Sequence, residues 1–174
     1  MGFKSFANKA VLEFLPAGNF GSGKEAKGIT AIVGPNGSGK SNVADAIKWA
    51  MGEQSMKNLR GRKSEDIIFA GSGSKARLSS ASVVLHFDNS DKRIPLDFSE
   101  VAIARKIFRS GESEYLINGS KVRLIDVIDL LAKAGVGKES YSVINQGMSD
   151  AFLNASIYDR RTIIEDAAGV KQYQ

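Results

Sequence analysis

Apolar residues recur along this chain with two periods, which together predict a mixture of strands and helices. A run of five apolar or β-branched residues at 29–33 precedes a glycine-rich segment. Such a run is typical of a buried parallel strand. Residues 42–51 then carry apolar side chains at helical spacing, and Gly52 stands where a helix commonly ends. The pattern predicts a strand, a loop and a helix in direct succession.

Alternating apolar residues later in the chain predict an antiparallel sheet. Strands are expected at 82–88, 102–108 and 115–117, with turns at 89–91, 110–112 and 118–119. Asn118-Gly119 is a strong signal for a tight hairpin. Nearer the N-terminus, residues 11–15 are expected to form a strand and 16–28 a polar loop. Residues 2–6 have the pattern of a strand end and a turn, so we expect a first strand to be missing from the front of the chain.

Further segments are predicted from helical spacing and charge. Residues 121–134 are expected to form a helix whose buried stripe is Val122, Ile125, Ile128 and Leu131. Residues 150–154 are expected to form a short helix, and 158–173 a longer, charged helix. A short strand ending in a polar turn is expected at 141–147. The segment 53–63 is basic and short of apolar residues, so we expect an exposed loop or short helix there.

Composition excludes several classes of protein. At 174 residues the chain can bury one domain core. It has no cysteine, which excludes disulfides and thiolate metal sites, and its single histidine, His86, cannot form a zinc site alone. No apolar run approaches the roughly 18 residues of a membrane span, so we expect a cytoplasmic protein. The net charge of +5 and the pI near 9.4 are compatible with nucleic acid as a partner.

The glycine-rich segment fits a phosphate-binding loop. Residues 34–41 read Gly-Pro-Asn-Gly-Ser-Gly-Lys-Ser, which matches the pattern G-x-x-x-x-G-K-[ST]. Gly34, Gly37 and Gly39 leave room for backbone N–H groups to surround phosphate and permit positive φ, and the next helix directs its positive end there. Lys40 would carry its charge to the β- and γ-phosphates, and the Ser41 hydroxyl would coordinate Mg²⁺. The alternative is a glycine-rich turn that binds no ligand.

Two other segments resemble the phosphate-binding motif but lack residues that it requires. Residues 18–24 also read G-x-x-x-x-G-K, but Glu25 follows where a hydroxyl is needed, and no apolar strand precedes them. We interpret that segment as a flexible surface loop. Residues 135–138 have Ala132 in place of the first glycine and are interpreted as a turn after a helix.

The acidic centre that an ATPase needs is not evident. Residues 83–88 are the nearest match to an apolar strand ending in aspartate, but His86 interrupts them and Asn89 stands where a catalytic glutamate belongs. We interpret Asp88-Asn89-Ser90 as a turn closing a hairpin. Residues 166–169 spell D-x-x-G within a helical pattern, and 78–82 lack the glycines of an ABC signature. The residues alone indicate a nucleotide-binding half without a complete catalytic centre.

An ordered set of stretches resembles the N-terminal ATPase head segment of SMC (structural maintenance of chromosomes) proteins of the prokaryotic condensin type. The stretches are 2–6, 34–42 with 45–49, 52–61, 66–71, 144–147 and 160–169. They cover nearly the whole chain in the family's order. The resemblance implies an α/β fold: an ABC-type P-loop NTPase lobe with a mixed sheet around the P-loop helix, plus an antiparallel sheet from residues 82–117.

The family's split head would explain the missing acidic centre. In that family a C-terminal lobe, far along the chain, carries the signature motif and the acidic pair. The resemblance therefore implies that residues 1–157 are the N-terminal lobe and that 158–174 begin the coiled-coil neck. It also implies that the chain is an excised or truncated lobe. The segment 18–27 is longer than the family's usual link, which puts its local path in doubt but not the ATP site.

The resemblance implies roles for individual residues. Lys40, Gln146 and Arg60 would be catalytic, Arg60 by reaching the nucleotide. Ser41 and Gln146 would coordinate Mg²⁺. The residues expected to bind ATP are Lys4, Ser5, Gly34, Pro35, Asn36, Gly37, Ser38, Gly39, Lys40, Ser41, Asn42 and Gln146. Without the resemblance, Gln146 would be interpreted as a surface turn residue, and the alternative for Arg60 is a solvated cation in a basic loop. Trp49 and Phe69 are expected to be core residues.

The function implied is ATP-driven engagement of heads and ATP hydrolysis, for chromosome condensation, segregation and DNA tethering. The partners implied are the C-terminal head lobe, a second SMC head in a homodimer, a kleisin subunit and double-stranded DNA, with no membrane. The location implied is the cytoplasm, on the nucleoid. A cationic segment that could contact DNA comprises Lys57, Arg60, Arg62, Lys63, Lys75 and Arg77, and the alternative is a solvated loop face.

Other functions stay open from the sequence. One is a split head of the RecN-like or RecF-like DNA-repair relatives, against which the stretch 53–61 argues. Another is a small-molecule P-loop kinase, which should carry an arginine-rich lid and an acidic acceptor motif, and neither is evident. A third is a binding module that holds nucleotide and hydrolyses nothing.

Overall fold

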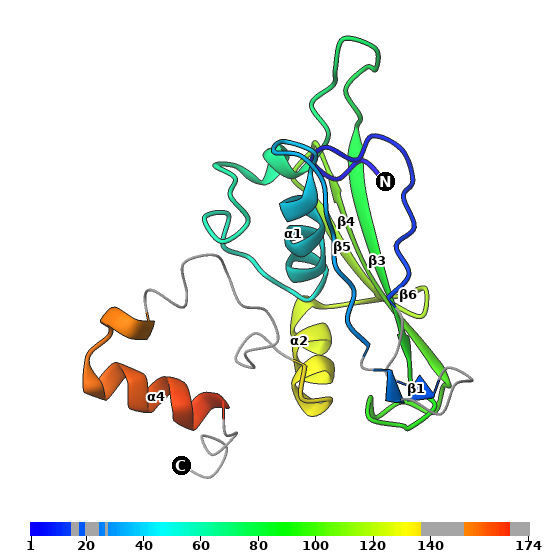
Figure 1. The fold of residues 1–174 in the computed structure, drawn as a ribbon. Helices are drawn as coiled ribbons and strands as arrows, with labels where there is room; N and C mark the ends of the chain where they lie inside the picture. The colour runs from blue at the N-terminus through cyan, green and yellow to red at the C-terminus, as the bar shows by residue number, and fades with distance from the viewer. Residues whose placement is uncertain (15–17, 20–24, 27, 137–151, 168–174) are drawn as a thin grey trace.

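The computed structural model describes residues 1–14, 18–19, 25–26, 28–136 and 152–167. A four-stranded antiparallel sheet forms its centre, in the order β3 (Ser80–Asp88), β4 (Glu100–Phe108), β5 (Ser113–Ile117) and β6 (Ser120–Val122). Two helices, α1 (Lys40–Ala50) and α2 (Leu124–Lys133), lie beside the sheet (Figure 1). The helix α4 (Ile157–Ala167) lies to one side of them.

Strand β4 shows why both helices pack on the same face of the sheet. Its odd-numbered residues are buried and its even-numbered residues are half-buried or exposed. Successive side chains of a strand point to opposite faces, so the odd positions form one continuous buried row. Ile107 packs with α1 at one end of that row, and Val101 and Ile103 pack with α2 at the other.

The buried side chains divide into two clusters, one under each helix. The cluster under α1 contains Phe3, Trp49, Leu59, Ile67, Ile68, Ala81 and Ile107. The cluster under α2 contains Ile94, Val101, Ile103, Val127, Leu130 and Leu131. The rings of Phe3 and Trp49 lie 5.4 Å apart at 45°, so the N-terminal segment packs directly on α1. Trp49 and Phe69 are buried, as predicted.

A buried arginine joins α1 to the sheet between the two clusters. Arg105 of β4 is 5% exposed, and its Nη1 donates to the carbonyl oxygens of Trp49 and Glu53, each at 2.8 Å. Its guanidinium lies 4.6 Å from the Trp49 ring centroid and 4.9 Å from that of Tyr115. Burial lowers the pKa of Arg105. The hydrogen bonds of this cation therefore offset the negative end of α1. The two aromatic rings stabilise the guanidinium itself by cation–π contacts.

The strands expected at 29–33 and 11–15 do not form among the described residues. Ile29 and Val33 are 81% and 87% exposed, and Val11 is 70% exposed. Every strand pair in the described part of the chain is antiparallel. A buried parallel strand needs a hydrogen-bonded neighbour on each side and a layer on each face. The described residues supply neither to 29–33, so the apolar run forms no strand with them and is exposed.

The helix expected at 121–134 begins later than predicted. The turn at Asn118-Gly119, both with positive φ, leads into β6, and α2 starts only at Leu124. The fully buried residues of α2 are Val127, Leu130 and Leu131, and Ile125 is 50% exposed. Of the predicted stripe, Leu131 is buried, Val122 packs half-buried against the same cluster from β6, and Ile128 is half-buried, so the prediction was wrong at Ile125.

The turn predicted after residue 88 is confirmed as a turn, but it opens a longer connection. Asp88 accepts hydrogen bonds from the backbone N–H and the hydroxyl of Ser90, which hold the pKa of Asp88 below its usual value. Asn89 is fully buried, and its side-chain amide donates to the carbonyl oxygens of Ile94, Leu96 and Phe98. This aspartate therefore organises a loop, as we interpreted it.

The remaining segments agree with the prediction in part. Leu59 lies in the basic segment 53–63 yet is fully buried, so that segment is anchored on α1 rather than wholly exposed. Within the predicted loop 16–28, β1 (Gly18–Asn19) pairs with β2 (Glu25–Ala26). Residues 64–67 form a short 3₁₀ helix, Ser64–Ile67, and 152–154 are helical. None of the helices in the described residues has the length and apolar character needed to cross a membrane.

The end of α1 gives a test of the packing between the two helices. Gly52 has φ +106, and a Cβ there would lie 3.1 Å from Cγ1 of Ile128 on α2. We expect Gly52→Ala to lower the free energy of unfolding by about 2 kcal/mol, through backbone strain and this contact. Urea unfolding followed by circular dichroism measures the change.

Two other glycines separate the causes. Gly111 has φ +87 and open space around its Cβ position, and Gly73 also has open space but no such φ. The order of destabilisation should be Gly52→Ala, then Gly111→Ala, then Gly73→Ala. Equal effects at Gly52 and Gly73 would contradict the packing described for α2.

Candidate functional site

The glycine-rich loop leads directly into α1 and shapes the start of the helix. Gly37 and Gly39 have φ +81 and +89, whereas Gly34 does not adopt a positive φ. Gly39 is the N-cap, and Asn42 N–H donates to its carbonyl at 2.9 Å. Among the described residues, no acceptor is seen for the N–H groups of Gly39, Lys40 and Ser41. These donors and the positive end of α1 favour an anion at the loop.

Lys40 folds back over the loop that precedes it. Its Nζ donates to the carbonyl oxygens of Gly34 at 2.6 Å and Pro35 at 2.8 Å. A cation at this place lies on the loop itself, where its charge adds to that of the helix end. A Cβ at Gly34 would come within 2.9 Å of the Ser38 hydroxyl, so the loop is closely folded there.

The N-terminal turn reaches the same place from the other end of the chain. Asn42 Nδ2 donates to the Ser5 hydroxyl at 2.8 Å. A Cβ at Gly39 would lie 2.7 Å from that hydroxyl. The structure therefore brings Ser5, one of the residues expected to bind ATP, against the loop. Glycine at position 39 is required both by its φ and by this close approach.

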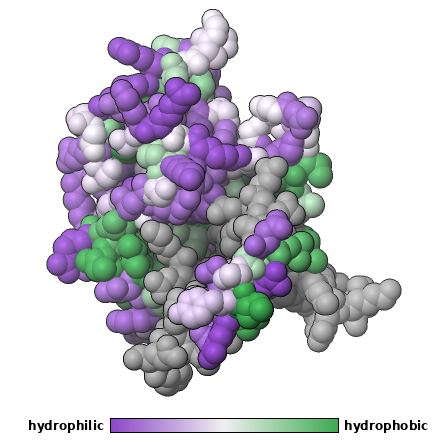
Figure 2. Space-filling view, turned by 90° about the vertical axis from the view of Figure 1, so that its left-hand side faces the viewer, coloured by the Kyte–Doolittle hydropathy of each residue, from purple (hydrophilic) through white to green (hydrophobic). Residues whose placement is uncertain are grey.

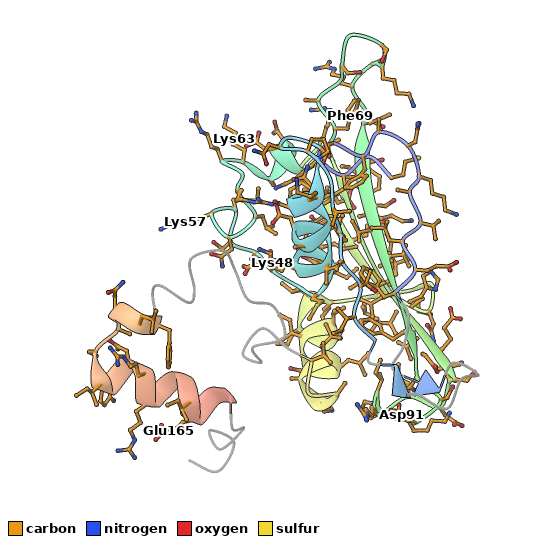
Figure 3. The ribbon with its side chains drawn as sticks, viewed as in Figure 1. Lys48, Lys57, Lys63, Phe69, Asp91 and Glu165 are labelled. Carbon is orange, nitrogen blue, oxygen red and sulfur yellow. The ribbon has the colours of Figure 1, made fainter. Side chains whose placement is uncertain are left out.

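A buried carboxylate that the sequence reasoning missed lies one turn into α1. Asp45 is 1% exposed and accepts hydrogen bonds from Lys4 Nζ at 2.5 Å and Arg60 Nη2 at 2.7 Å. Lys48 Nζ lies 3.5 Å from its other oxygen. Figure 3 shows Lys48 beside α1, whereas Lys57 and Lys63 point away from it. An isolated acidic residue on an apolar helix face, among neighbouring cations, was the signal available in the sequence.

Asp45 determines where two of the predicted site residues lie. Lys4 directs its ammonium to Asp45 and to the Leu59 carbonyl, rather than to the loop. Arg60 binds Asp45 and also donates to the Ser41 carbonyl at 2.7 Å. Gln146, the third predicted catalytic residue, lies outside the described residues. The structure thus gathers Ser5, Lys40 and Ser41 at the loop and fixes Lys4 and Arg60 beside them.

The charge on Asp45 is stabilised by its cations. Burial by itself raises the pKa of this carboxyl group, but hydrogen bonds from Lys4 and Arg60 and their positive charges outweigh burial. The net result is a pKa below the ordinary value. Asp45 is therefore ionised throughout the neutral range, and the group of charges around it stays positive overall.

The comparisons with known proteins agree with this geometry. The family model of the RecF/RecN/SMC N terminal domain matches residues 1–143. The chain belongs to the RecF/RecN/SMC N-terminal domain family. This finding confirms the predicted resemblance to SMC head segments.

Curated relatives resemble the SMC-family chain along its whole length. It is 52% identical over 174 residues to the chromosome partition protein Smc of Bacillus subtilis (strain 168), and 53% identical over 173 residues to that of Mycobacterium leprae (strain TN). These alignments cover 100% and 99% of this chain and 14% of each relative. The chain therefore spans about a seventh of the length of these relatives.

Solved structures confirm the fold class. A structure from work on ATP-driven dimerization and DNA-stimulated activation of SMC ATPases matches with a TM-score of 0.83 and 38% identity, covering 95% of this chain and 93% of that one. An Smc head domain from Pyrococcus furiosus, bound to the C-terminal domain of ScpA, matches with a TM-score of 0.85 and 36% identity, covering 99% and 41%. The SMC-family chain has the ABC-type P-loop fold of these heads.

The buried carboxylate predicts a specific dependence of stability on pH. Because the pKa of Asp45 is lowered on folding, its contribution is fully present above the unfolded aspartate pKa, about 3.9, and is lost as pH falls through the lower folded value. We expect Asp45→Asn to lower the free energy of unfolding by about 3 kcal/mol at pH 7, because Lys4 and Arg60 lose their counter-charge. This difference should shrink below about pH 4.

Urea unfolding at a series of pH values measures this difference. Asp126→Asn is the matched control, because Asp126 pairs with Arg123 at 2.9 Å but its side chain is 36% exposed, against 1% for Asp45. Its effect at pH 7 should be much smaller than that of Asp45→Asn. A difference for Asp45→Asn that stays constant from pH 7 to pH 3 would contradict the ionised carboxylate.

Proposed function

We propose that the chain binds ATP as the N-terminal part of an SMC-type ATPase head. The observation that carries this proposal is the closely folded loop at the start of α1, with Lys40 on it and with Ser5 and Arg60 beside it. Backbone N–H groups, a helix end and two cations are a donor set suited to a triphosphate. The residues present therefore fit ATP.

The chain's own residues take separate parts in that binding. Lys40 supplies a positive charge for the β- and γ-phosphates, and the loop 34–42 supplies backbone N–H groups. The Ser41 hydroxyl, with Gln146, provides oxygen ligands for Mg²⁺, the ion that neutralises phosphate charge when bound. Pro35, Asn36 and Ser38 shape the loop.

We further propose that hydrolysis needs a second lobe. The nearest match to an acidic centre in the sequence, Asp88, is engaged with Ser90 at a loop, and the carboxylate of Asp45 near the phosphate loop is bound by Lys4 and Arg60. The uncovered apolar residues Ile29, Ile32 and Val33 lead straight into that loop. A C-terminal lobe of the same protein would place strands beside them and supply the missing acidic residues.

The C-terminal helix supports a division of the chain near residue 157. The helix α4 carries exposed apolar residues: Ile157, Tyr158 and Ile164, and Leu153 just before it is also exposed. Such a face needs a partner, and we propose that 1–157 form the lobe and 158–174 begin a coiled-coil neck that contacts a kleisin subunit. A related Smc head is bound to ScpA.

In the intact protein, ATP would join this head to a second copy, and hydrolysis would release it. The work done would be DNA tethering in chromosome condensation and segregation, in the cytoplasm on the nucleoid. Work on related SMC ATPases describes ATP-driven dimerization and DNA-stimulated activation. The cationic segment at 57–77 is the proposed contact for double-stranded DNA. Figure 2 shows hydrophilic side chains over the upper part of the face that includes residues 53–63.

Lys40 gives the direct test of ATP binding. We expect Lys40→Ala to weaken binding of Mg·ATP at least about tenfold, because a charge-assisted hydrogen bond to phosphate is lost. Calorimetric titration of the chain measures the affinity. Lys133→Ala replaces an exposed lysine at the end of α2 and should leave the affinity for Mg·ATP unchanged. Equal binding by wild type and Lys40→Ala would contradict the proposed function.

The split head predicts that turnover depends on mixing. The chain alone should hydrolyse ATP negligibly, and addition of the C-terminal lobe of its parent protein should produce hydrolysis that Lys40→Ala and Gln146→Ala abolish. Phosphate release and sedimentation measure turnover and dimerisation. Robust turnover by the lone chain would show that the acidic centre lies within these residues.

The DNA contact predicts a change in salt dependence. In the intact protein, Arg62→Glu with Lys63→Glu should reduce the slope of log affinity against log salt by about two, because two phosphate contacts are lost. Fluorescence anisotropy with a duplex measures this slope. Arg93→Glu with Lys133→Glu removes the same charge elsewhere and should leave the slope nearly unchanged. If the Arg62 and Lys63 reversal has no effect, the segment does not contact DNA.

A further inference from the structure

Arg60 is held beside the phosphate loop by an unusual combination of contacts. Its Nε and Nη2 both donate to Oδ2 of Asp45, at 3.2 and 2.7 Å, and Nη2 also donates to the Ser41 carbonyl. Ser41 and Asp45 lie four residues apart, so they occupy one face of α1. The guanidinium is therefore fixed on the first turn of α1, next to the residue that follows Lys40.

The guanidinium keeps donors available in this position. Among the described residues, Nη1 of Arg60 has no hydrogen-bond acceptor, and the side chain is 49% exposed. Asp45, by contrast, is 1% exposed, so its carboxylate is shielded from solvent. One edge of the guanidinium is therefore bound to protein, and the other faces solvent beside the loop.

The backbone shows that this position is maintained against strain. Arg60 has φ +52 and Lys4 has φ +47, values that L-residues adopt rarely. The side chains of both residues donate hydrogen bonds to Asp45. Unfavourable backbone conformations persist where the surrounding contacts fix them. The fully buried Leu59 anchors the chain immediately before Arg60.

We infer that Asp45 is a positioning residue for nucleotide binding, which acts through Arg60 without touching the nucleotide. Its buried carboxylate fixes the guanidinium so that Nη1 is presented to a phosphate oxygen of ATP at the loop. The inference rests on the proposed function, because it takes the ligand of the loop to be ATP. Lys4 holds Asp45 from the other side and keeps the carboxylate ionised.

Fixing an arginine in advance matters because a free arginine side chain loses conformational freedom when it binds. A guanidinium already held by a carboxylate loses less freedom when it contacts phosphate. Removing the carboxylate charge should therefore weaken binding even though Arg60 remains. If the substitution at Asp45 instead damaged the loop, binding should weaken whether or not Arg60 is present. Dependence of the effect on Arg60 therefore separates a positioning role from a structural one.

A double-mutant cycle tests the inference in the intact protein. Affinity for Mg·ATP is measured by calorimetric titration for wild type, Asp45→Asn, Arg60→Ala and the double variant. We expect Asp45→Asn to weaken binding about fivefold to tenfold and Arg60→Ala at least about tenfold. The double variant should be no weaker than Arg60→Ala, because Asp45 acts through that side chain.

Asp126→Asn serves as the matched control, since it removes the charge of another Asp–Arg pair, away from the loop. It should leave the affinity unchanged. Thermal unfolding of each variant shows that titrations are made on folded protein. If Asp45→Asn does not fold, Asp45→Glu keeps the charge but displaces it by one methylene group. It should weaken binding a few-fold when Arg60 is present and not at all in Arg60→Ala.

The outcomes distinguish this inference from the proposed function. Additive losses in the cycle, or unchanged affinity in folded Asp45→Asn, would overturn the positioning role. Unchanged affinity in Arg60→Ala, with binding still dependent on Lys40, would also overturn it while leaving ATP binding in place. Loss of the Lys40 dependence would instead refute the proposed function.

Discussion

A carboxylate that water cannot reach must be surrounded by hydrogen-bond donors or positive charge, and this constraint on Asp45 organises the region around the phosphate loop. The donors come from segments far apart in the sequence: Lys4 from the N-terminus and Arg60 from the segment after α1. Removing a partner from a buried pair is costly, so these segments are bound to α1 together. This arrangement therefore determines which segments lie next to the phosphate loop in front of α1.

The elements that local patterns specify were predicted well. Helix α1, the phosphate loop and the three long strands of the sheet follow from apolar spacing, from the glycines and from the hairpin signal at Asn118-Gly119. Each depends on residues that are neighbours in the sequence. The helix after the hairpin was misplaced because β6 uses only three residues, Ser120–Val122, too few for a visible alternation.

The features that depend on distant contacts could not be predicted in this way. Nothing in the local sequence shows that Leu59 is buried, and the position of Asp45 on an apolar helix face does not show that Lys4 and Arg60 are the cations that bind it. The segment 29–33 shows the opposite case, because its pattern indicates a buried strand although the described residues leave it uncovered. An apolar pattern indicates that a segment should be buried. The structure shows whether the described residues of this chain bury it. Of the candidate site, Ser5, Lys40 and Ser41 were predicted to meet, and Asp45 was not.

The sandwich of Arg105 between Trp49 and Tyr115 has a consequence for how this protein can vary. The buried cation donates to the carbonyl oxygens of Trp49 and Glu53 and lies against both rings, so its charge is tolerated only while these groups remain in place. Replacing Trp49, Arg105 or Tyr115 alone therefore leaves the other two without a contact that stabilises them. Trp49, Arg105 and Tyr115 should therefore be replaced together or kept together, as a single unit of covariation that spans a helix and two strands.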